Sequence, residues 1–268
     1  MDHYSKLAGE ALGRLRSANP VVHSITNYVV MNSTANVLLA MGASPIMAHA
    51  TEELNDIVNI ASSIVINIGT LSSQWIESMN HACRLAKVAG KPLVLDPVGS
   101  GATKFRTDTA CNIVKTTVPT VVRGNASEIL SLSPQGGTTR GVDSLHTMED
   151  AFEAAKAVAA KLGTCIAVTG ERDLVTDGSR SLVIANGHSF MRKVTGTGCA
   201  ATVIVAAFLA VESDPVIASA AALAFFGLAG EKAAAESSGP GTFWQKTLDA
   251  LYNVTPKDLE AGARITEA

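Results

Sequence analysis

Residues 63–97 carry the pattern that decides the fold, and they read SIVINIGTLSSQWIESMNHACRLAKVAGKPLVLDP. A β-branched apolar run opens this stretch, and a second apolar run at 92–95 closes it. Residues 72–90 between them have the character of a helix, with Ser72 as the expected N-cap and Gly90 as the expected stop signal. Two short buried strands joined by a helix predict a βαβ unit, in which the two strands run parallel.

The same alternation of strand and helix continues along the chain. It predicts an α/β fold with a central, largely parallel sheet. No break in composition divides the chain, so residues 1–268 are expected to form a single domain. The strands are predicted at 63–68, 92–95, 120–122 and 164–168, the further helices at 103–117 and 147–162, and a loop at 134–137.

Asn186-Gly187 is a turn signal between two apolar runs, at 181–185 and 189–194. An Asn-Gly dipeptide between two such runs is typical of a β-hairpin. We therefore expect these two runs to pair with each other as antiparallel strands at one edge of the sheet.

Composition excludes several classes of protein. With 47% hydrophobic and 17% charged residues among 268, disorder is excluded, and a net charge of -3 argues against a nucleic-acid binder, which needs clustered Lys and Arg. The four cysteines form no C-x-x-C pair, so a metal ribbon or thioredoxin-type site is not supported. No signal segment is visible and no apolar run reaches the roughly 20 residues that span a bilayer. We expect a cytoplasmic protein with no membrane partner, in which two Ala-rich helices lie buried.

Polar residues and glycines follow several of the predicted strands. In open α/β sheets, ligands bind beyond the carboxyl ends of the strands. Each of these residues alone is an ordinary loop residue, but together they combine a carboxylate, a cation, glycines and hydrogen-bonding groups, which suits a polyphosphate with a divalent cation. These residues are Gly69, Asp96, Arg123, Asn125, Thr169 and Gly170.

The segment Thr195-Gly196-Thr197-Gly198-Cys199 comes directly before an apolar helix expected from Ala200. Glycines at a helix start let backbone N–H groups point at an anion, and the helix dipole favours negative charge there. The segment matches neither the dinucleotide G-x-G-x-x-G motif nor a P-loop. By itself, it is as compatible with a plain turn as with an anion site.

Seven blocks in order extend this pattern over nearly the whole chain. With them the chain resembles the hydroxyethylthiazole kinase family, thiamine-salvage enzymes of the ribokinase-like superfamily. The resemblance implies a ribokinase-like fold with helices on both faces of the sheet, and ATP-dependent phosphorylation of the primary alcohol of 4-methyl-5-(2-hydroxyethyl)thiazole with Mg²⁺. It also implies a homotrimer with thiazole sites where subunits meet. The blocks are HSITN at 23–27, MGASP at 41–45, NIGTL at 67–71, LDPVGSGA at 95–102, RGNASE at 123–128, VTGE at 168–171 and TGTGC at 195–199.

The resemblance also implies a role for each matching residue. Cys199 stands where most of the superfamily has a catalytic aspartate, a departure typical of the thiazole kinases. A thiol is mostly neutral at pH 7, so we expect a weak base and a slow kinase; the residue also suits a small buried thiol in an Ala-rich helix. The implied sets are Gly196, Thr197, Gly198 and Cys199 for catalysis; Arg123, Asn125, Thr169 and Gly170 for ATP; Asn27, Met47, Gly69 and Gly196 for the thiazole; and Asp96 and Glu128 for Mg²⁺.

Three other functions remain open on the sequence. A pyrimidine or pyridoxal kinase, or an ATP-dependent NAD(P)H-hydrate dehydratase, would be expected to carry Asp in place of Cys199. A nucleotide-binding sensor that performs no catalysis need not keep the base position, the carboxylates and the anion site together, and here all three are present.

Overall fold

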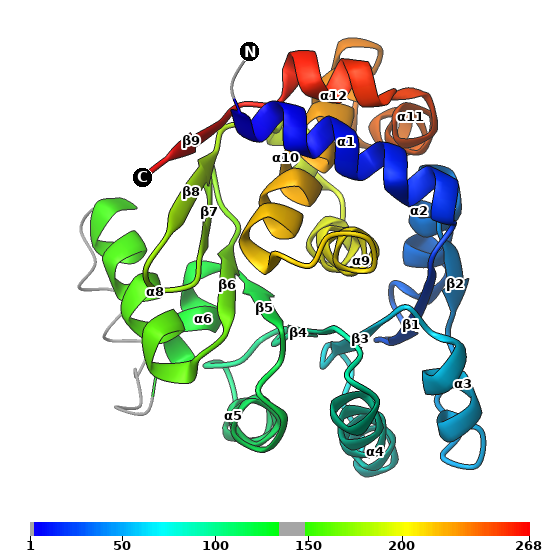
Figure 1. The fold of residues 1–268 in the computed structure, drawn as a ribbon, viewed down its shortest axis with the longest axis vertical. Coiled ribbons are helices and arrows are strands. Elements are labelled where there is room, and N and C mark those ends of the chain that lie inside the picture. The colour runs from blue at the N-terminus through cyan, green and yellow to red at the C-terminus, as the bar shows by residue number, and fades with distance from the viewer. Residues whose placement is uncertain (1–2, 134–147) are drawn as a thin grey trace.

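The computed structural model describes residues 3–133 and 148–268, and within them the chain builds one nine-stranded sheet between two layers of helices (Figure 1). The strand order is β2-β1-β3-β4-β5-β6-β7-β8-β9. Strands β1 to β6 pair in parallel, and β7, β8 and β9 join as antiparallel strands. The expected α/β fold with a mainly parallel sheet is therefore confirmed.

The strands of this sheet are β1 (Val21–Ile25), β2 (Ser44–Ile46), β3 (Ser63–Asn67), β4 (Leu93–Asp96), β5 (Val121–Gly124), β6 (Cys165–Val168), β7 (Asp173–Thr176), β8 (Ser181–Ile184) and β9 (Ile265–Glu267). The helices are α1 (His3–Ala18), α2 (Met31–Met41), α3 (Leu54–Ile60), α4 (Ser73–Ala89), α5 (Lys104–Thr117), α6 (Ala126–Ser131), α8 (Met148–Leu162), the 3₁₀ helix η1 (Ser189–Lys193), α9 (Thr197–Leu209), α10 (Pro215–Ala235), α11 (Pro240–Asn253) and α12 (Pro256–Gly262).

The first βαβ unit, β3-α4-β4, forms as the sequence predicts. Ser72 is the N-cap of α4, and its hydroxyl accepts a hydrogen bond from Trp75 N. Gly90 ends the helix in the left-handed conformation at φ +63°, which glycine adopts without a steric penalty. The strands predicted at 120–122 and 164–168 and the helices predicted at 103–117 and 147–162 agree to within two residues, whereas the helix expected from Ala200 begins three residues earlier, at Thr197. The loop predicted at 134–137 lies outside the described residues.

Alternate residues of each strand face different helix layers. Val65 and Val94 point into the layer that contains α9 and α10, whereas Ile64 and Ile66 point into the opposite layer with α4 and α5. Figure 1 shows these two layers on either side of the sheet. Because both faces are covered, the strands are apolar throughout rather than alternating.

The two Ala-rich helices expected to lie inside are α9 and α10, which pack on each other within one apolar layer. By length and composition α10 could cross a membrane, but 83% of an apolar 18-residue stretch of it is buried inside the protein. We therefore interpret α10 as a core helix.

The hairpin predicted between 181–185 and 189–194 is wrong. Residues 189–193 form η1, and β8 pairs instead with β7 on one side and with β9 from the C-terminal end on the other. The tight turn lies before β8, where Gly178 has φ +92° and Asp177 Oδ1 accepts hydrogen bonds from Ser179 N and Arg180 N. Because β7 and β9 occupy both edges of β8, the residues that follow Asn186 cannot pair with β8 as a further strand.

The sheet also has a point at which the strand order reverses. Because β1 lies between β2 and β3, the chain leaves β1 first toward one edge and then toward the other. In open α/β sheets, ligands bind beyond the carboxyl ends of the strands at such a switch point. Asn27 follows β1 and Gly69 follows β3 at this place.

Candidate active site

The first turn of α9 lies beyond the carboxyl ends of the parallel strands. Gly196 precedes it in the left-handed conformation at φ +87°, and among the described residues no side chain caps this helix start. The Thr197 hydroxyl donates to Met191 O at 2.9 Å and so ties the turn to η1. The N–H groups of Thr197, Gly198 and Cys199 precede the first helical hydrogen bond, from Ala200 N to Gly196 O at 2.8 Å. These N–H groups are available to an anion, so the anion site at this helix start stays a prediction that the geometry allows.

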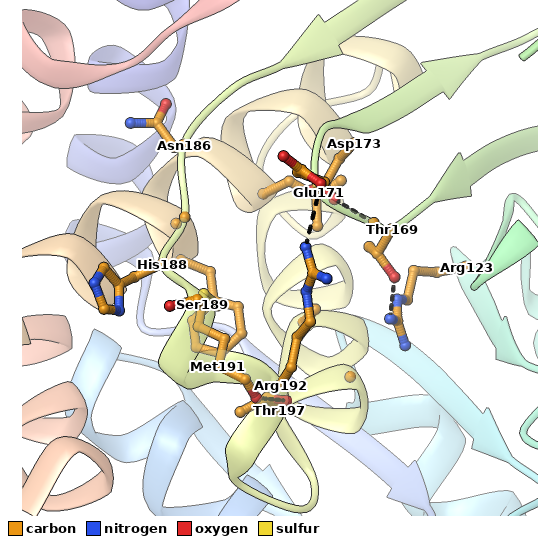
Figure 2. A pocket seen from close by; sticks show the side chains of 17 residues that line it. Arg123, Thr169, Glu171, Asp173, Asn186, His188, Ser189, Met191, Arg192 and Thr197 are labelled. Atoms are coloured by element: carbon orange, nitrogen blue, oxygen red, sulfur yellow. Dashed lines mark hydrogen bonds and ion pairs between the residues drawn. The ribbon is translucent and has the colours of Figure 1, made fainter. Parts of the chain in front are cut away.

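A cavity of about 520 Å³ opens on one side of this turn (Figure 2). Five predicted residues line it: Arg123, Thr169, Gly170, Thr197 and Gly198. Leu223 and Phe226 from α10 line another part with apolar surface. The cavity therefore offers a cation and amide donors together with an apolar wall, a combination that suits a nucleotide.

Arg123 connects the cavity to the buried part of the site. Its side chain is only 8% exposed, and its Nη2 donates to the Thr169 hydroxyl. Nη1 lies 3.7 Å from Asp96 Oδ2, and a Cβ added at Gly198 would lie 2.9 Å from the same Nη1. The guanidinium is thus held against the first turn of α9, where a planar cation suits phosphate oxygens.

Asn67, at the end of β3, joins the other side of the turn into one hydrogen-bond network. Its Nδ2 donates to Asp96 Oδ2 at 2.8 Å and lies 3.2 Å from Cys199 Sγ. Its Oδ1 accepts from Asn27 Nδ2 at 2.8 Å and from Gly69 N at 3.0 Å. Four predicted site residues therefore meet around one residue that the sequence analysis did not select.

Asp96 is fully buried and hydrogen-bonded through one oxygen. Oδ2 accepts from Asn67 and, at 2.8 Å, from the Thr202 hydroxyl, whereas Oδ1 has no hydrogen-bond partner among the residues that the structure describes. Burial raises the pKa of Asp96 to about 6; the charge of Arg123 opposes this rise and the charge of Glu128 adds to it. A buried carboxylate oxygen without a donor is compatible with a nearby cation.

Cys199 lies in the first turn of α9, between Asn27 and Asn67. Asn27 Nδ2 is 3.6 Å from its sulfur. Burial raises the pKa of the Cys199 thiol to about 11, the charge of Asp96 raises it further, and the hydrogen bond from Asn67 lowers it. At pH 7 the thiol therefore carries its proton. All four cysteines of the chain are free thiols.

Asn125 and Glu128 form a capping box at the start of α6 and are not among the cavity residues. Asn125 Oδ1 accepts from Glu128 N at 2.9 Å, and Glu128 Oε2 accepts from Asn125 N at 2.8 Å. Glu128 Oε1 accepts from Gly99 N at 2.9 Å. Lone pairs remain on both carboxylate oxygens, and the negative charge of Glu128 contributes to the raised pKa of Asp96.

No three His, Cys, Asp or Glu side chains form a metal-binding cluster within residues 3–133 and 148–268. Magnesium commonly uses one or two protein carboxylates and keeps several waters. The orphan Oδ1 of Asp96 and the lone pairs of Glu128 fit that requirement. The roles of Asp96 and Glu128 toward Mg²⁺ stay a prediction, as does the role of Asn125 toward ATP.

The predicted thiazole-side residues are only partly brought together. Asn27 and Gly69 join through Asn67, and Gly196 begins the turn that carries Cys199. Met47 follows β2, one strand further from this network, and packs half-buried against the apolar layer that includes α9.

Three residues of the site were not selected from the sequence: Asn67, Thr202 and Asp173. Asn67 is the one amide in a run of apolar strand residues, and Thr202 is one of few hydroxyl residues in an Ala-rich helix, so each offered a signal. Asp173 lines the cavity and accepts from Gly170 N at 2.9 Å. Its position at the start of a strand gave no such signal.

The fold is shared with solved proteins of low sequence identity. A solved ribokinase-like superfamily protein from Enterococcus faecalis superposes with a TM-score of 0.61 over 94% of this chain and 83% of its own, at 18% identity. That likeness concerns the fold alone, and it shows that the chain has the ribokinase-like fold.

The closer relationship is specific. The model of the hydroxyethylthiazole kinase family matches residues 12–257, and the chain belongs to this family. It is 52% identical to the hydroxyethylthiazole kinase of Desulfotalea psychrophila over 268 residues, which cover all of this chain and 98% of the relative. The solved hydroxyethylthiazole kinase protein of Pyrococcus horikoshii is 44% identical, with a TM-score of 0.91 over 98% of this chain and 99% of its own. The resemblance stated from the seven sequence blocks is therefore confirmed.

Proposed function

We propose that the protein transfers the γ-phosphoryl group of ATP to the primary alcohol of 4-methyl-5-(2-hydroxyethyl)thiazole, a step of thiamine salvage. Membership of a kinase family implies ATP as co-substrate. The observation that carries the proposal is the position of the first turn of α9, which has the Arg123 cavity on one side and the Asn27–Asn67–Cys199 network on the other. Donor and acceptor can approach the same unpaired amides from two sides.

Phosphoryl transfer depends on positioning and charge stabilisation more than on covalent chemistry. In this proposal the triphosphate of ATP points toward Arg123 and Gly198, and its adenine ring lies toward Leu223 and Phe226. The N–H groups at the start of α9 then stabilise the transferring phosphoryl group, because they are oriented before the reaction begins.

Cys199 is proposed to receive the proton of the attacking alcohol as a weak base. A protonated thiol with a pKa of about 11 cannot take up a proton before it loses its own, so its contribution at pH 7 is small. Asn67 and Asn27 fix the sulfur by donating toward it. Catalysis then rests on the alignment of the alcohol, which agrees with the expectation of a slow kinase.

Asp96 and Glu128 are proposed to hold Mg²⁺, directly or through water. The bound ion would neutralise charge on the phosphate oxygens. Asp96 stands on the Arg123 side of the network, since Arg123 Nη1 lies 3.7 Å from its Oδ2. Thr202 and Asn67 orient Asp96 so that its second oxygen stays unpaired.

A homotrimer with thiazole sites between subunits is part of the proposal, together with a cytoplasmic location. Two large apolar side chains directly after Asn27 support a shared site: Tyr28 is 62% and Val29 64% exposed. A second subunit covering them would also close the thiazole side. Light scattering of the active enzyme tests this, and an active monomer would contradict it.

The decisive experiment is an ADP-release assay with one acceptor at a time: the thiazole alcohol, pyridoxal, a pyrimidine alcohol and no acceptor. ADP release that requires the thiazole alcohol and Mg²⁺ supports the proposal. Preference for another acceptor would contradict the substrate assignment. Full activity without Mg²⁺ would contradict only the roles given to Asp96 and Glu128.

A further inference from the structure

One wall of the nucleotide-side cavity is held in place from behind by residues that are not among those lining it. Asn186 and Gly187 line the cavity in the segment that joins β8 to η1 (Figure 2). Gly187 N donates to Glu231 Oε1 at 2.7 Å, and Asn186 Nδ2 lies 3.3 Å from the same oxygen. Glu231 belongs to α10, so its carboxylate ties this segment to the core helix.

Arg264 completes the support from the C-terminal segment. Its guanidinium pairs with both oxygens of Glu231, at 3.1 Å from Nη1 to Oε2 and through a short contact from Nη2 to Oε1. Nη2 also donates to Ala185 O at 2.7 Å, and Arg264 N donates to Asn186 Oδ1 at 2.7 Å. The segment 185–187 is therefore held at three consecutive residues by one bidentate ion pair and its backbone.

The same helix carries the apolar side of the cavity. Leu223 and Gly227 of α10 line it, and Gly227 lies one helical turn before Glu231. A Cβ added at Gly227 would lie 2.6 Å from the carbonyl carbon of Asn186, so the helix and the segment touch directly. Glu231 thus links α10 to the segment 185–187, two walls of one cavity, and Arg264 holds the Glu231 carboxylate in place.

We propose that Glu231 and Arg264 are positioning residues for nucleotide binding, acting through Asn186 and Gly187. The inference rests on the proposed function only in that the cavity takes a nucleotide. Holding a binding wall in its bound arrangement before the ligand arrives reduces the ordering cost of binding. Loss of the pair therefore weakens nucleotide binding without altering the thiazole side, which lies beyond the first turn of α9.

The chain provides a matched control. Arg180 pairs with both oxygens of Asp214, at 2.7 and 3.2 Å, and also with Asp177. Its side chain is 53% exposed, compared with 51% for Arg264. Both arginines belong to the antiparallel end of the sheet, but Arg180 and its partners are not among the cavity residues.

The test compares wild type with Glu231→Gln, Glu231→Ala, Arg264→Gln and the control Arg180→Gln. We measure the Kd of ADP by calorimetry, and the KM of ATP, the KM of the thiazole alcohol and kcat by ADP release. Glu231→Ala and Arg264→Gln are expected to raise the Kd of ADP and the KM of ATP about tenfold, a factor equal to about 1.4 kcal/mol. Glu231→Gln keeps an acceptor for Gly187 N, so we expect it to raise the Kd of ADP and the KM of ATP by a smaller factor than Glu231→Ala does.

The thiazole KM and kcat at saturating ATP are expected to stay within about twofold, and Arg180→Gln is expected to change none of these values. Unchanged ADP affinity in Arg264→Gln, or an equal rise in both KM values, would overturn the inference. Arg264→Gln keeps Glu231 in place and serves as the test if Glu231→Ala fails to fold. Wild type that binds ADP but ignores the thiazole alcohol would refute the proposed function and leave this comparison valid; wild type that does not bind ADP would overturn both.

Discussion

Replacing Thr202 with valine removes one hydrogen bond from the buried Asp96, together with a longer contact of 3.4 Å from the same hydroxyl to Gly198 O. The Thr202 hydroxyl donates to Asp96 Oδ2 at 2.8 Å, and both side chains have no exposed surface. Valine has nearly the same shape as threonine, so no cavity opens, and water cannot replace the lost donor. A hydrogen bond to a charged group contributes about 1.5–3 kcal/mol. We expect Thr202→Val to lower the free energy of unfolding by about 2 kcal/mol at pH 7.

The loss depends on pH in a defined direction. The bond from Thr202 lowers the pKa of Asp96, which burial raises to about 6, so the valine variant raises this pKa further. When the pKa of a carboxyl group is higher in the folded than in the unfolded state, the free energy of unfolding falls as pH rises from the unfolded-state pKa to the folded-state pKa. The difference between variant and wild type should therefore be smaller at pH 5 than at pH 7, as measured by urea unfolding at both pH values.

Thr247→Val is the matched control for this prediction. Thr247 is also buried in a helix, and its hydroxyl donates to the neutral Phe243 O at 2.8 Å. Because that carbonyl also takes part in the helix, we expect a loss of less than about 1 kcal/mol with no change between pH 5 and 7. Equal losses in the two variants, or a loss for Thr202→Val that is independent of pH, would refute the assignment of Asp96 as a buried carboxylate stabilised by its donors.

Further predictions concern the reaction and the cavity. Cys199→Asp should keep or raise turnover, because a carboxyl group has a much lower ordinary pKa than a thiol and gives up its own proton more readily, and Cys199→Ala should lower it; complete loss of ADP release in both would contradict the base assignment. Arg123→Lys should raise the KM of ATP at least tenfold, since one ammonium cannot replace a guanidinium that contacts Thr169 and faces Asp96; an unchanged KM would remove Arg123 from the phosphate site. The stability of Asp173→Asn relative to wild type should increase as pH rises from 4 to 7, because burial raises the pKa of Asp173 to about 6 and its ionisation destabilises the folded wild type. Urea unfolding of both proteins at several pH values measures this difference, and a difference that does not change with pH would contradict the prediction.

The parallel strands β3 to β6 were predictable from local signals, whereas the parallel strands β1 and β2 were not selected from the sequence. Ser72 and Gly90 mark the two ends of α4 without help from the rest of the fold, because a cap and a left-handed terminus are local chemistry. The antiparallel end was not, since one of the two partners of β8 is β9, which follows about 80 residues later in the chain, at residues 265–267. An Asn-Gly pair predicts a hairpin only when the following segment finds a free strand edge.

The same distinction applies to the candidate site. Gly196, Gly198 and Cys199 are consecutive, or nearly so, and their pattern in the sequence is also their pattern in space. Asn67 and Thr202 are 135 positions apart by their numbers, and they meet only because β3 and α9 converge on Asp96. Such a residue is found by tracing the hydrogen-bond partners of a buried carboxylate, which needs the fold.

Asp96 and Cys199 share Asn67 as a donor, and this sharing decides where the proton lies. Two negative charges around one amide in a buried site would repel each other. The charge of Asp96 helps to raise the pKa of Cys199 to about 11, while Arg123 counteracts the rise of the Asp96 pKa to about 6. Between these values the carboxylate is ionised and the sulfur protonated. At pH 7 the negative charge therefore stays next to Arg123, and the neutral thiol leaves the first turn of α9 free to attract phosphate.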